Sequence, residues 1–181
     1  MAQRFPDISL EDSERLERLF WLVAHKQSIE KMENFTEAND LSQFVNSRDK
    51  YGNTLLHRIA GTYDVQKAEL LCEKYNLVPS VNSMGGGGLK PLDLAVFIGN
   101  FEIVKLLTMK YKNDYTTDFV SCYGSILHMS VSDNNLEMTK FLSENYELSH
   151  FDNSKDDEGM TPLDWAFKRN NLEMVKILIE F

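Results

Sequence analysis

Apolar residues recur along this chain in pairs of short, helix-like runs separated by polar breaks. In the last pair, Leu163 and Ala166 lie three residues apart, and after a two-asparagine break Leu172, Val175 and Leu178 continue at the same spacing. A spacing of three or four residues places side chains on one face of a helix. The pattern predicts a short helix, a tight turn and a second helix, followed by an extended loop that leads to the next pair.

The opening of the short helix is repeated at a nearly constant interval. Steps of 36, 35 and 36 residues separate four such openings, Thr54-Leu-Leu-His57, Lys90-Pro-Leu-Asp93, Ser125-Ile-Leu-His128 and Thr161-Pro-Leu-Asp164. A Thr or Ser hydroxyl caps a helix start, and Pro suits the first helical position because its missing N–H costs nothing there. A period of this length predicts an all-α stack in which each helix pair contacts only its neighbours.

The four units resemble the ankyrin repeat, whose pattern is D-x-x-G-x-T-P-L-H-x-A, a glycine turn, an E-[IV]-V-x-L-L helix and a V-N exit. The fourth unit carries this pattern as Asp156-Asp-Glu-Gly159-Met-Thr-Pro-Leu-Asp-Trp-Ala166, and the exit occurs as Val45-Asn46 and Val81-Asn82. The resemblance covers residues 45–181 and implies an ankyrin-repeat solenoid of four repeats, at about 49–83, 84–119, 120–154 and 155–181. Ankyrin repeats are usually about 33 residues long, so the longer period predicts longer connecting loops.

Residues 1–44 match the repeat poorly but retain helical spacing. Ser13 is the predicted cap of a first helix that carries Leu16, Leu19, Phe20, Val23 and Ala24, and a second helix is predicted across residues 28–37. Terminal units of a stack face water on one side and are therefore atypical. We expect this segment to form a degenerate N-terminal helical cap.

Charge and apolar content exclude several classes of partner and place the protein inside a cell. The net charge of −9 disfavours nucleic acid, and the longest apolar runs are too short to span a membrane. The start of the chain lacks the apolar core of a secretory signal, and Cys72 and Cys122 lack metal-ligand spacing. We expect an intracellular protein with reduced thiols, in the cytoplasm and/or nucleus, with delivery into a host cell as an alternative.

The residues that suggest catalysis or metal binding fit structural roles better. His57 and His128 hold the ankyrin position that the resemblance assigns to a hydrogen-bonded structural histidine, and Asp93 and Asp164 hold it in the other units. The run Gly85–Gly88 precedes Lys90-Pro91 without the Ser or Thr of a phosphate-binding loop, so it predicts a flexible hairpin tip. We predict no catalytic, cofactor or metal site.

In proteins similar to this one, partners bind the loop tips and the exposed ends of the inner helices. The strip expected to supply affinity is Tyr63, Phe97 and Ile98, because exposed aromatic anchors are typical of interfaces. The acidic tip at Asp157 and Glu158 is either a solvated loop or a region that attracts a basic partner. The predicted protein-binding residues are Tyr51, Tyr63, Leu89, Phe97, Ile98, Tyr123, Asp157, Glu158, Trp165, Lys168 and Arg169.

These features favour a non-enzymatic adaptor or regulatory subunit that binds another protein on its concave face. Two sharper alternatives are an inhibitor similar to those of NF-κB and the ankyrin module of an intracellular-pathogen effector. A different class is the ankyrin part of an enzyme whose catalytic domain lies beyond Phe181. The last helix lacks a polar closing unit, which predicts end-to-end self-association or a longer chain.

Overall fold

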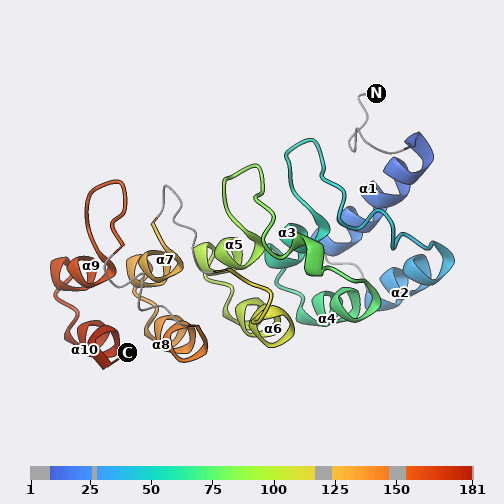
Figure 1. The fold of residues 1–181 in the computed structure, drawn as a ribbon. Helices are drawn as coiled ribbons and strands as arrows, with labels where there is room; N and C mark the ends of the chain where they lie inside the picture. The colour runs from blue at the N-terminus through green and yellow to red at the C-terminus, as the bar shows by residue number, and fades with distance from the viewer. Residues whose placement is uncertain (1–8, 26–27, 117–123, 147–153, 181) are drawn as a thin grey trace.

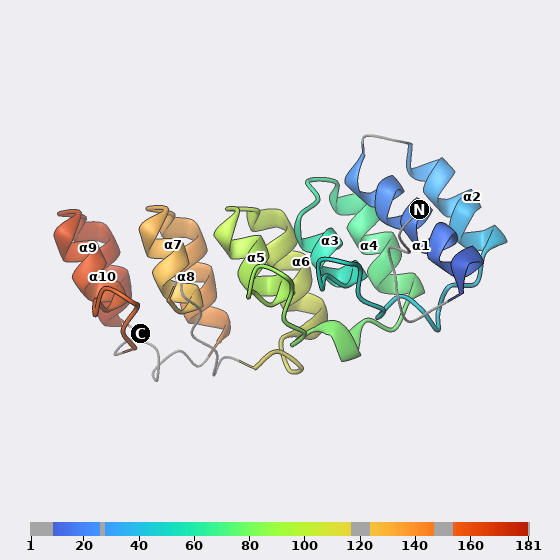
Figure 2. The ribbon, with the colours of Figure 1, turned by 90° about the horizontal axis from the view of Figure 1, so that it is seen from above.

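The computed structural model describes residues 9–25, 28–116, 124–146 and 154–180 of the chain. Within these ranges every regular element is helical, and the helices form an elongated stack of antiparallel pairs (Figure 1). Seen from above, the pairs follow one another in sequence order along one row (Figure 2). The predicted all-α ankyrin solenoid is therefore confirmed.

Four inner helices lie side by side below the hairpin loops and contact one another in turn. They are α3 (Leu55–Ala60), α5 (Pro91–Phe97), α7 (Ile126–Ser132) and α9 (Pro162–Lys168). Each is paired with an outer helix: α4 (Val65–Lys74), α6 (Phe101–Tyr111), α8 (Leu136–Asn145) and α10 (Leu172–Glu180). A short 3-10 helix, η1 (Val78–Ser80), follows α4.

In the last two repeats, the turn between the paired helices lies at two consecutive asparagines. Asn134 and Asn170 adopt positive φ of 57° and 52°, a conformation that asparagine tolerates better than most side chains. The next residue then caps the outer helix, because Asn135 Oδ1 accepts from Met138 N at 2.9 Å and Asn171 Oδ1 accepts from Met174 N at 3.0 Å. One Asn-Asn pair thus both reverses the chain and starts a helix.

The N-terminal pair, α1 (Leu10–Ala24) and α2 (Ile29–Ala38), extends the stack by packing against α3 and α4. The predicted cap at Ser13 is wrong: α1 begins at Leu10, and Ser9 Oγ accepts from Asp12 N at 3.1 Å. Ser9 is followed three residues later by a carboxylate, as in a capping box, whereas Ser13 is buried inside the helix.

A fully buried lysine joins this N-terminal pair to the first repeat. Lys67 lies in α4 at the position that Ile103, Met138 and Met174 occupy in the other outer helices. Its ammonium donates to the carbonyls of Leu22 at 3.1 Å and His25 at 2.6 Å, at the end of α1. The carbonyls of a helix's last turn have no partner within the helix, so Lys67 satisfies groups that would otherwise be orphaned.

A second buried polar cluster fixes the loop that follows α6. The Tyr115 hydroxyl donates to the Asp93 carboxylate, and Lys90 Nζ donates to Thr116 O at 2.7 Å. Burial raises the pKa of Asp93, and the Tyr115 hydrogen bond partly opposes that rise. Asp93 also accepts from Lys90 N at 3.2 Å, which is the structural hydrogen-bonding role expected at its position.

Candidate partner-binding cleft

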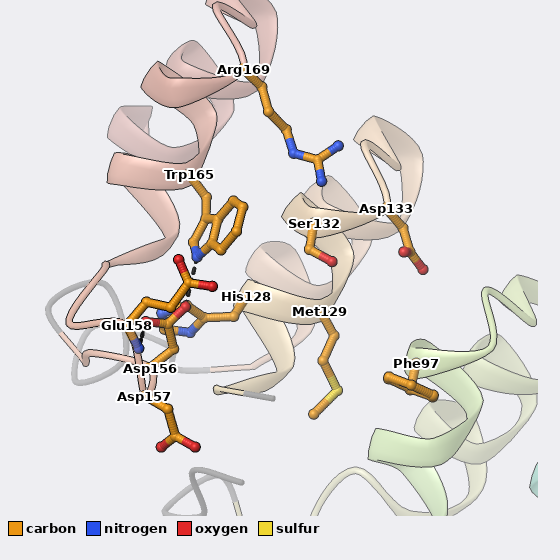
Figure 3. A pocket seen from close by; sticks show the side chains of 10 residues that line it. All are labelled: Phe97, His128, Met129, Ser132, Asp133, Asp156, Asp157, Glu158, Trp165 and Arg169. Carbon is orange, nitrogen blue, oxygen red and sulfur yellow. Dashed lines mark hydrogen bonds between the residues drawn. The ribbon is translucent and has the colours of Figure 1, made fainter. Parts of the chain in front are cut away.

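A cleft of about 270 Å³ opens on the inner-helix side of the last two repeats, between the end of α5, α7 and the loop before α9 (Figure 3). It is lined by Phe97, His128, Met129, Ser132, Asp133, Asp156, Asp157, Glu158, Trp165 and Arg169. Aromatic and apolar side chains therefore share the cleft with four carboxylates and one guanidinium.

The acidic wall of the cleft is shaped by Asp156, which folds the loop around its own carboxylate. Asp156 Oδ1 accepts from the backbone N–H groups of Glu158 and Met160, both at 2.9 Å, and Gly159 adopts a φ of 76°. An aspartate whose side chain accepts from backbone N–H groups a few residues later mimics the hydrogen bond of a backbone turn. This turn leaves Asp157 and Glu158 exposed at the tip, as the sequence predicts.

Trp165 is held against this loop by a hydrogen bond from its indole Nε1 to Asp156 Oδ2 at 2.7 Å. The same position in the first repeat is Arg58, which donates to Asp49 Oδ2 at 2.7 Å. In both repeats, the large side chain at this position therefore donates a hydrogen bond to the aspartate of the preceding hairpin and anchors that hairpin to the inner helix. Trp165 remains half-buried, so part of its ring still lines the cleft.

The base of the cleft is fixed by His128. Its Nδ1 accepts from Ser125 N at 3.0 Å, and its Nε2 donates to Met160 O at 3.0 Å, which ties α7 to the next hairpin. Burial lowers the pKa of His128, so the neutral ring is favoured. His57 makes the equivalent contacts to Thr54 N at 3.1 Å and Leu89 O at 3.2 Å, which confirms the structural role predicted for both histidines.

The charges at the rim are only partly compensated. Glu158 pairs with Lys168 at 3.5 Å, and both Lys168 and Arg169 lie over the Trp165 ring, 4.4 and 5.8 Å from its centroid. Among the described residues, neither Asp133 nor Asp157 forms an ion pair. The rim therefore presents uncompensated negative charge.

Asp156 contributes to this charge because it stays ionised. Desolvation acts to raise the pKa of Asp156, but the hydrogen bonds from Trp165, Met160 and Glu158 together lower it below its usual value. A carboxylate stabilised in its ionised form keeps the wall of the cleft negative through the neutral pH range.

The predicted binding residues do not all lie at one site. Phe97, Asp157, Glu158, Trp165 and Arg169 come together in the cleft, with Lys168 beside them. Tyr51 and Tyr63 are 55% and 77% exposed but lie outside it; Tyr63 lines a separate hollow with His25 and Thr62. Ile98 is half-buried at the end of α5. Met129 lines the cleft although no sequence signal distinguishes it from a core residue.

Leu89 is a correction, because it is only 5% exposed and its carbonyl accepts from His57 Nε2. Its side chain belongs to the core and cannot extend a binding strip. Tyr123, another predicted tip residue, lies outside the described residues.

The glycine run lies in the hairpin loop before α5, where it was predicted, and one side of it is closely packed. A side chain at Gly86 would place its Cβ 1.8 Å from Tyr51 O, so this loop packs against the preceding hairpin. Positive φ occurs within the run only at Gly88, at 71°. Close packing explains Gly85 and Gly86, and the positive φ explains Gly88.

The described part of the chain also bears on metal binding and on membrane insertion. No group of three or more His, Cys, Asp or Glu side chains there is arranged to hold a metal ion. None of its helices is both long and apolar enough to cross a bilayer.

Comparison with known proteins identifies one family. Residues 113–181 match the family model for ankyrin repeats (3 copies). A protein of Rickettsia felis that is named for ankyrin repeats is 25% identical over 147 residues, an alignment that covers 68% of this chain and 37% of that protein. The chain therefore spans just over a third of the length of this relative.

Proposed function

This chain is an ankyrin-repeat protein, and from that premise we propose that it binds a basic segment of another protein in the cleft between α7 and α9. Ankyrin repeats generally mediate protein–protein interaction and are generally non-catalytic. The observation that carries the proposal is the cleft itself, where the half-buried Trp165 and the exposed Phe97 stand beside uncompensated carboxylates.

The chemistry of the lining supports a cationic partner. Phe97 and the half-buried Trp165 offer apolar contact, while Asp133 and Asp157 offer carboxylates to a Lys or Arg side chain. Lys168 and Arg169 lie over the Trp165 ring and make that edge of the cleft positive. A cationic side chain of the partner is therefore expected beside Asp157 and away from that edge. Complementary charge of this kind increases association rate and specificity more than affinity.

The proposal is limited to partner binding inside a cell. An adaptor, a regulatory subunit, an inhibitor and an effector delivered into a host would all use such a cleft. The free Cys72 is buried, in keeping with a reduced compartment.

A selection from a displayed random-peptide library tests the proposal without a known partner. The parent protein is expected to enrich peptides with Lys or Arg next to an apolar residue, and binding of those peptides should weaken as salt increases. An Asp133→Asn/Asp157→Asn variant should lose them. The matched control is Glu137→Gln/Glu144→Gln, which removes the same charge from the outer helix α8 and should bind like the parent.

Two results would contradict the proposal. One is enrichment of acidic or uncharged peptides by the parent protein. The other is equal binding of the enriched peptides by the parent and the Asp133→Asn/Asp157→Asn variant, which would place the interface on another surface.

A further inference from the structure

Three successive inner helices end in side chains of different chemistry at equivalent positions. The capping residue at the C-terminal end of α5, α7 and α9 is Ile98, Asp133 and Arg169, respectively. Phe97, the last residue of α5, is 41% exposed beside the half-buried Ile98, and Asp133 and Arg169 are exposed. From α5 to α9, the row of helix ends is therefore apolar, acidic and basic.

This row of helix ends lies in the cleft. Phe97, Asp133 and Arg169 all line it, and Figure 3 shows them on three neighbouring helices. The first repeat does not extend the row, because Gly61 caps α3 without a side chain and the next residue, Thr62, is only 6% exposed. Three consecutive repeats thus supply three contact points at one level of the cleft.

The two charges of the row are available to a partner. Arg169 lies 5.8 Å from the centroid of the Trp165 ring, but within the described ranges neither Arg169 nor Asp133 forms an ion pair. The neighbouring Lys168, by contrast, pairs with Glu158 at 3.5 Å. Opposite charges in adjacent repeats that do not neutralise each other favour a partner that carries the complementary charges in the same order.

The spacing of the row indicates the conformation of such a partner. Helices packed side by side lie about 8–10 Å apart. A polyproline II segment has three residues per turn and rises about 3.1 Å per residue, so every third side chain returns to the same face about 9.3 Å further on. Side chains on one face of a β-strand are only about 6.6 Å apart, and no strand occurs in the described ranges to pair with one. The polyproline II period therefore matches the row.

We propose that the partner segment crosses the ends of α5, α7 and α9 as a polyproline II helix and presents an apolar, a basic and an acidic side chain at every third position. The apolar side chain contacts Phe97, the basic one pairs with Asp133, and the acidic one pairs with Arg169. This inference rests on the proposed function, because it concerns the same cleft, and it adds an order and a spacing to the basic character of the partner. The contact beside Asp157 comes from a further cationic side chain outside the row.

Fluorescence anisotropy with labelled synthetic peptides tests the order and the spacing. The first peptide carries leucine, arginine and glutamate at the first, fourth and seventh positions of a proline-rich segment. A second peptide carries them in the reverse order, because polyproline II segments are considered in both chain directions. Control peptides move the arginine to the third or fifth position, and all peptides end in the same pair of lysines. One ordered peptide is expected to bind roughly fivefold more tightly than its controls.

Charge reversal tests the contact with Arg169. Arg169→Glu should weaken binding of the ordered peptide about fivefold, and replacing the glutamate of the peptide with lysine should restore it. Lys176→Glu is the matched control, because it makes the same change of charge at an exposed position of the outer helix α10 and should bind like the parent. Circular dichroism establishes that both variants are folded.

Three results would overturn the inference. Control peptides that bind as tightly as the ordered ones would exclude the spacing, although binding that still depends on Asp133 and Asp157 would leave the proposed function standing. An Arg169→Glu variant that binds the ordered peptide like the parent would exclude the acidic contact. A parent that binds none of these peptides but enriches other basic peptides from the random library would overturn this inference alone, whereas a parent that enriches no basic peptide would overturn both.

Discussion

The first and the last helix pair of the described stack turn different outward faces to solvent. At the N-terminal end, α1 and α2 cover the first repeat with buried residues such as Leu16, Leu19 and Met32 and turn charged side chains outward. At the C-terminal end, the cluster around Ala166 and Met174 is small, and large apolar side chains remain exposed. A helix pair closes a stack only when its outward face has been replaced by polar residues.

Replacing Lys67, which joins the N-terminal pair to the first repeat, should cause the largest single loss of stability. Replacing Lys67 with alanine removes two hydrogen bonds to the end of α1 and leaves a cavity, so we expect a loss of about 3 kcal/mol in unfolding free energy. Urea denaturation followed by circular dichroism measures it.

The control for this prediction is Lys67→Met, which places in α4 the residue type found at Met138 and Met174. Methionine fills the space but leaves the carbonyls of Leu22 and His25 unpaired, so the expected loss is about 1.5 kcal/mol. A methionine variant as stable as the parent would show that these hydrogen bonds do not hold the N-terminal pair in place.

Tyr115→Phe should have the next largest effect on stability, in the loop that follows α6. It removes the donor to the buried Asp93 carboxylate, with an expected loss of about 2 kcal/mol. Tyr146→Phe is the comparison, because Tyr146 donates only to the neutral Thr108 Oγ1 at 3.0 Å and should cost about 1 kcal/mol. Equal losses in denaturant titrations would mean that the Asp93 charge adds nothing to its hydrogen bond.

Trp165→Phe should destabilise the last repeat by a smaller amount. It removes the indole donor to Asp156 in a half-buried site, and we expect about 1 kcal/mol. A double-mutant cycle with Asp156→Asn should give a coupling energy of similar size. No coupling in the cycle would show that Trp165 does not anchor its hairpin.

The smallest expected effect is a loss of stability in mild acid. Burial lowers the pKa of His57 and His128 in the folded protein, whereas in the unfolded chain they titrate near 6.5. The unfolded chain then binds more protons, so this contribution is complete above pH 6.5 and declines as the pH falls toward the folded pKa values. Thermal melts of a His57→Asn/His128→Asn variant should show a flatter pH dependence across that range, and an unchanged slope would refute it.

The sequence predicts the repeat because each repeat carries its own local signals. The period of the helix openings, the Asn-Asn turns and the paired roles of His57 and Asp93 are all determined by residues close together in the chain. Ser9 was missed because it lies four residues before the predicted cap, where both serines precede acidic residues.

The remaining differences come from contacts between repeats, which a local pattern does not contain. Leu89 lies in a hairpin loop, but it is buried and its carbonyl accepts from His57 Nε2 of the preceding repeat. Lys67 interrupts an apolar position, and only the nearby end of α1 explains it. The cleft combines residues from three repeats, so its aromatic and acidic members were predicted separately and not as one site.

Hydrogen exchange followed by mass spectrometry, resolved by helix, tests the contrast between the two ends most directly. At low concentration, amides in α9 and α10 should exchange fastest, and those in α3 and α5 slowest. Equal protection of the α1–α2 and α9–α10 pairs would contradict a stack whose first helix pair is well packed and whose last helix pair is largely exposed.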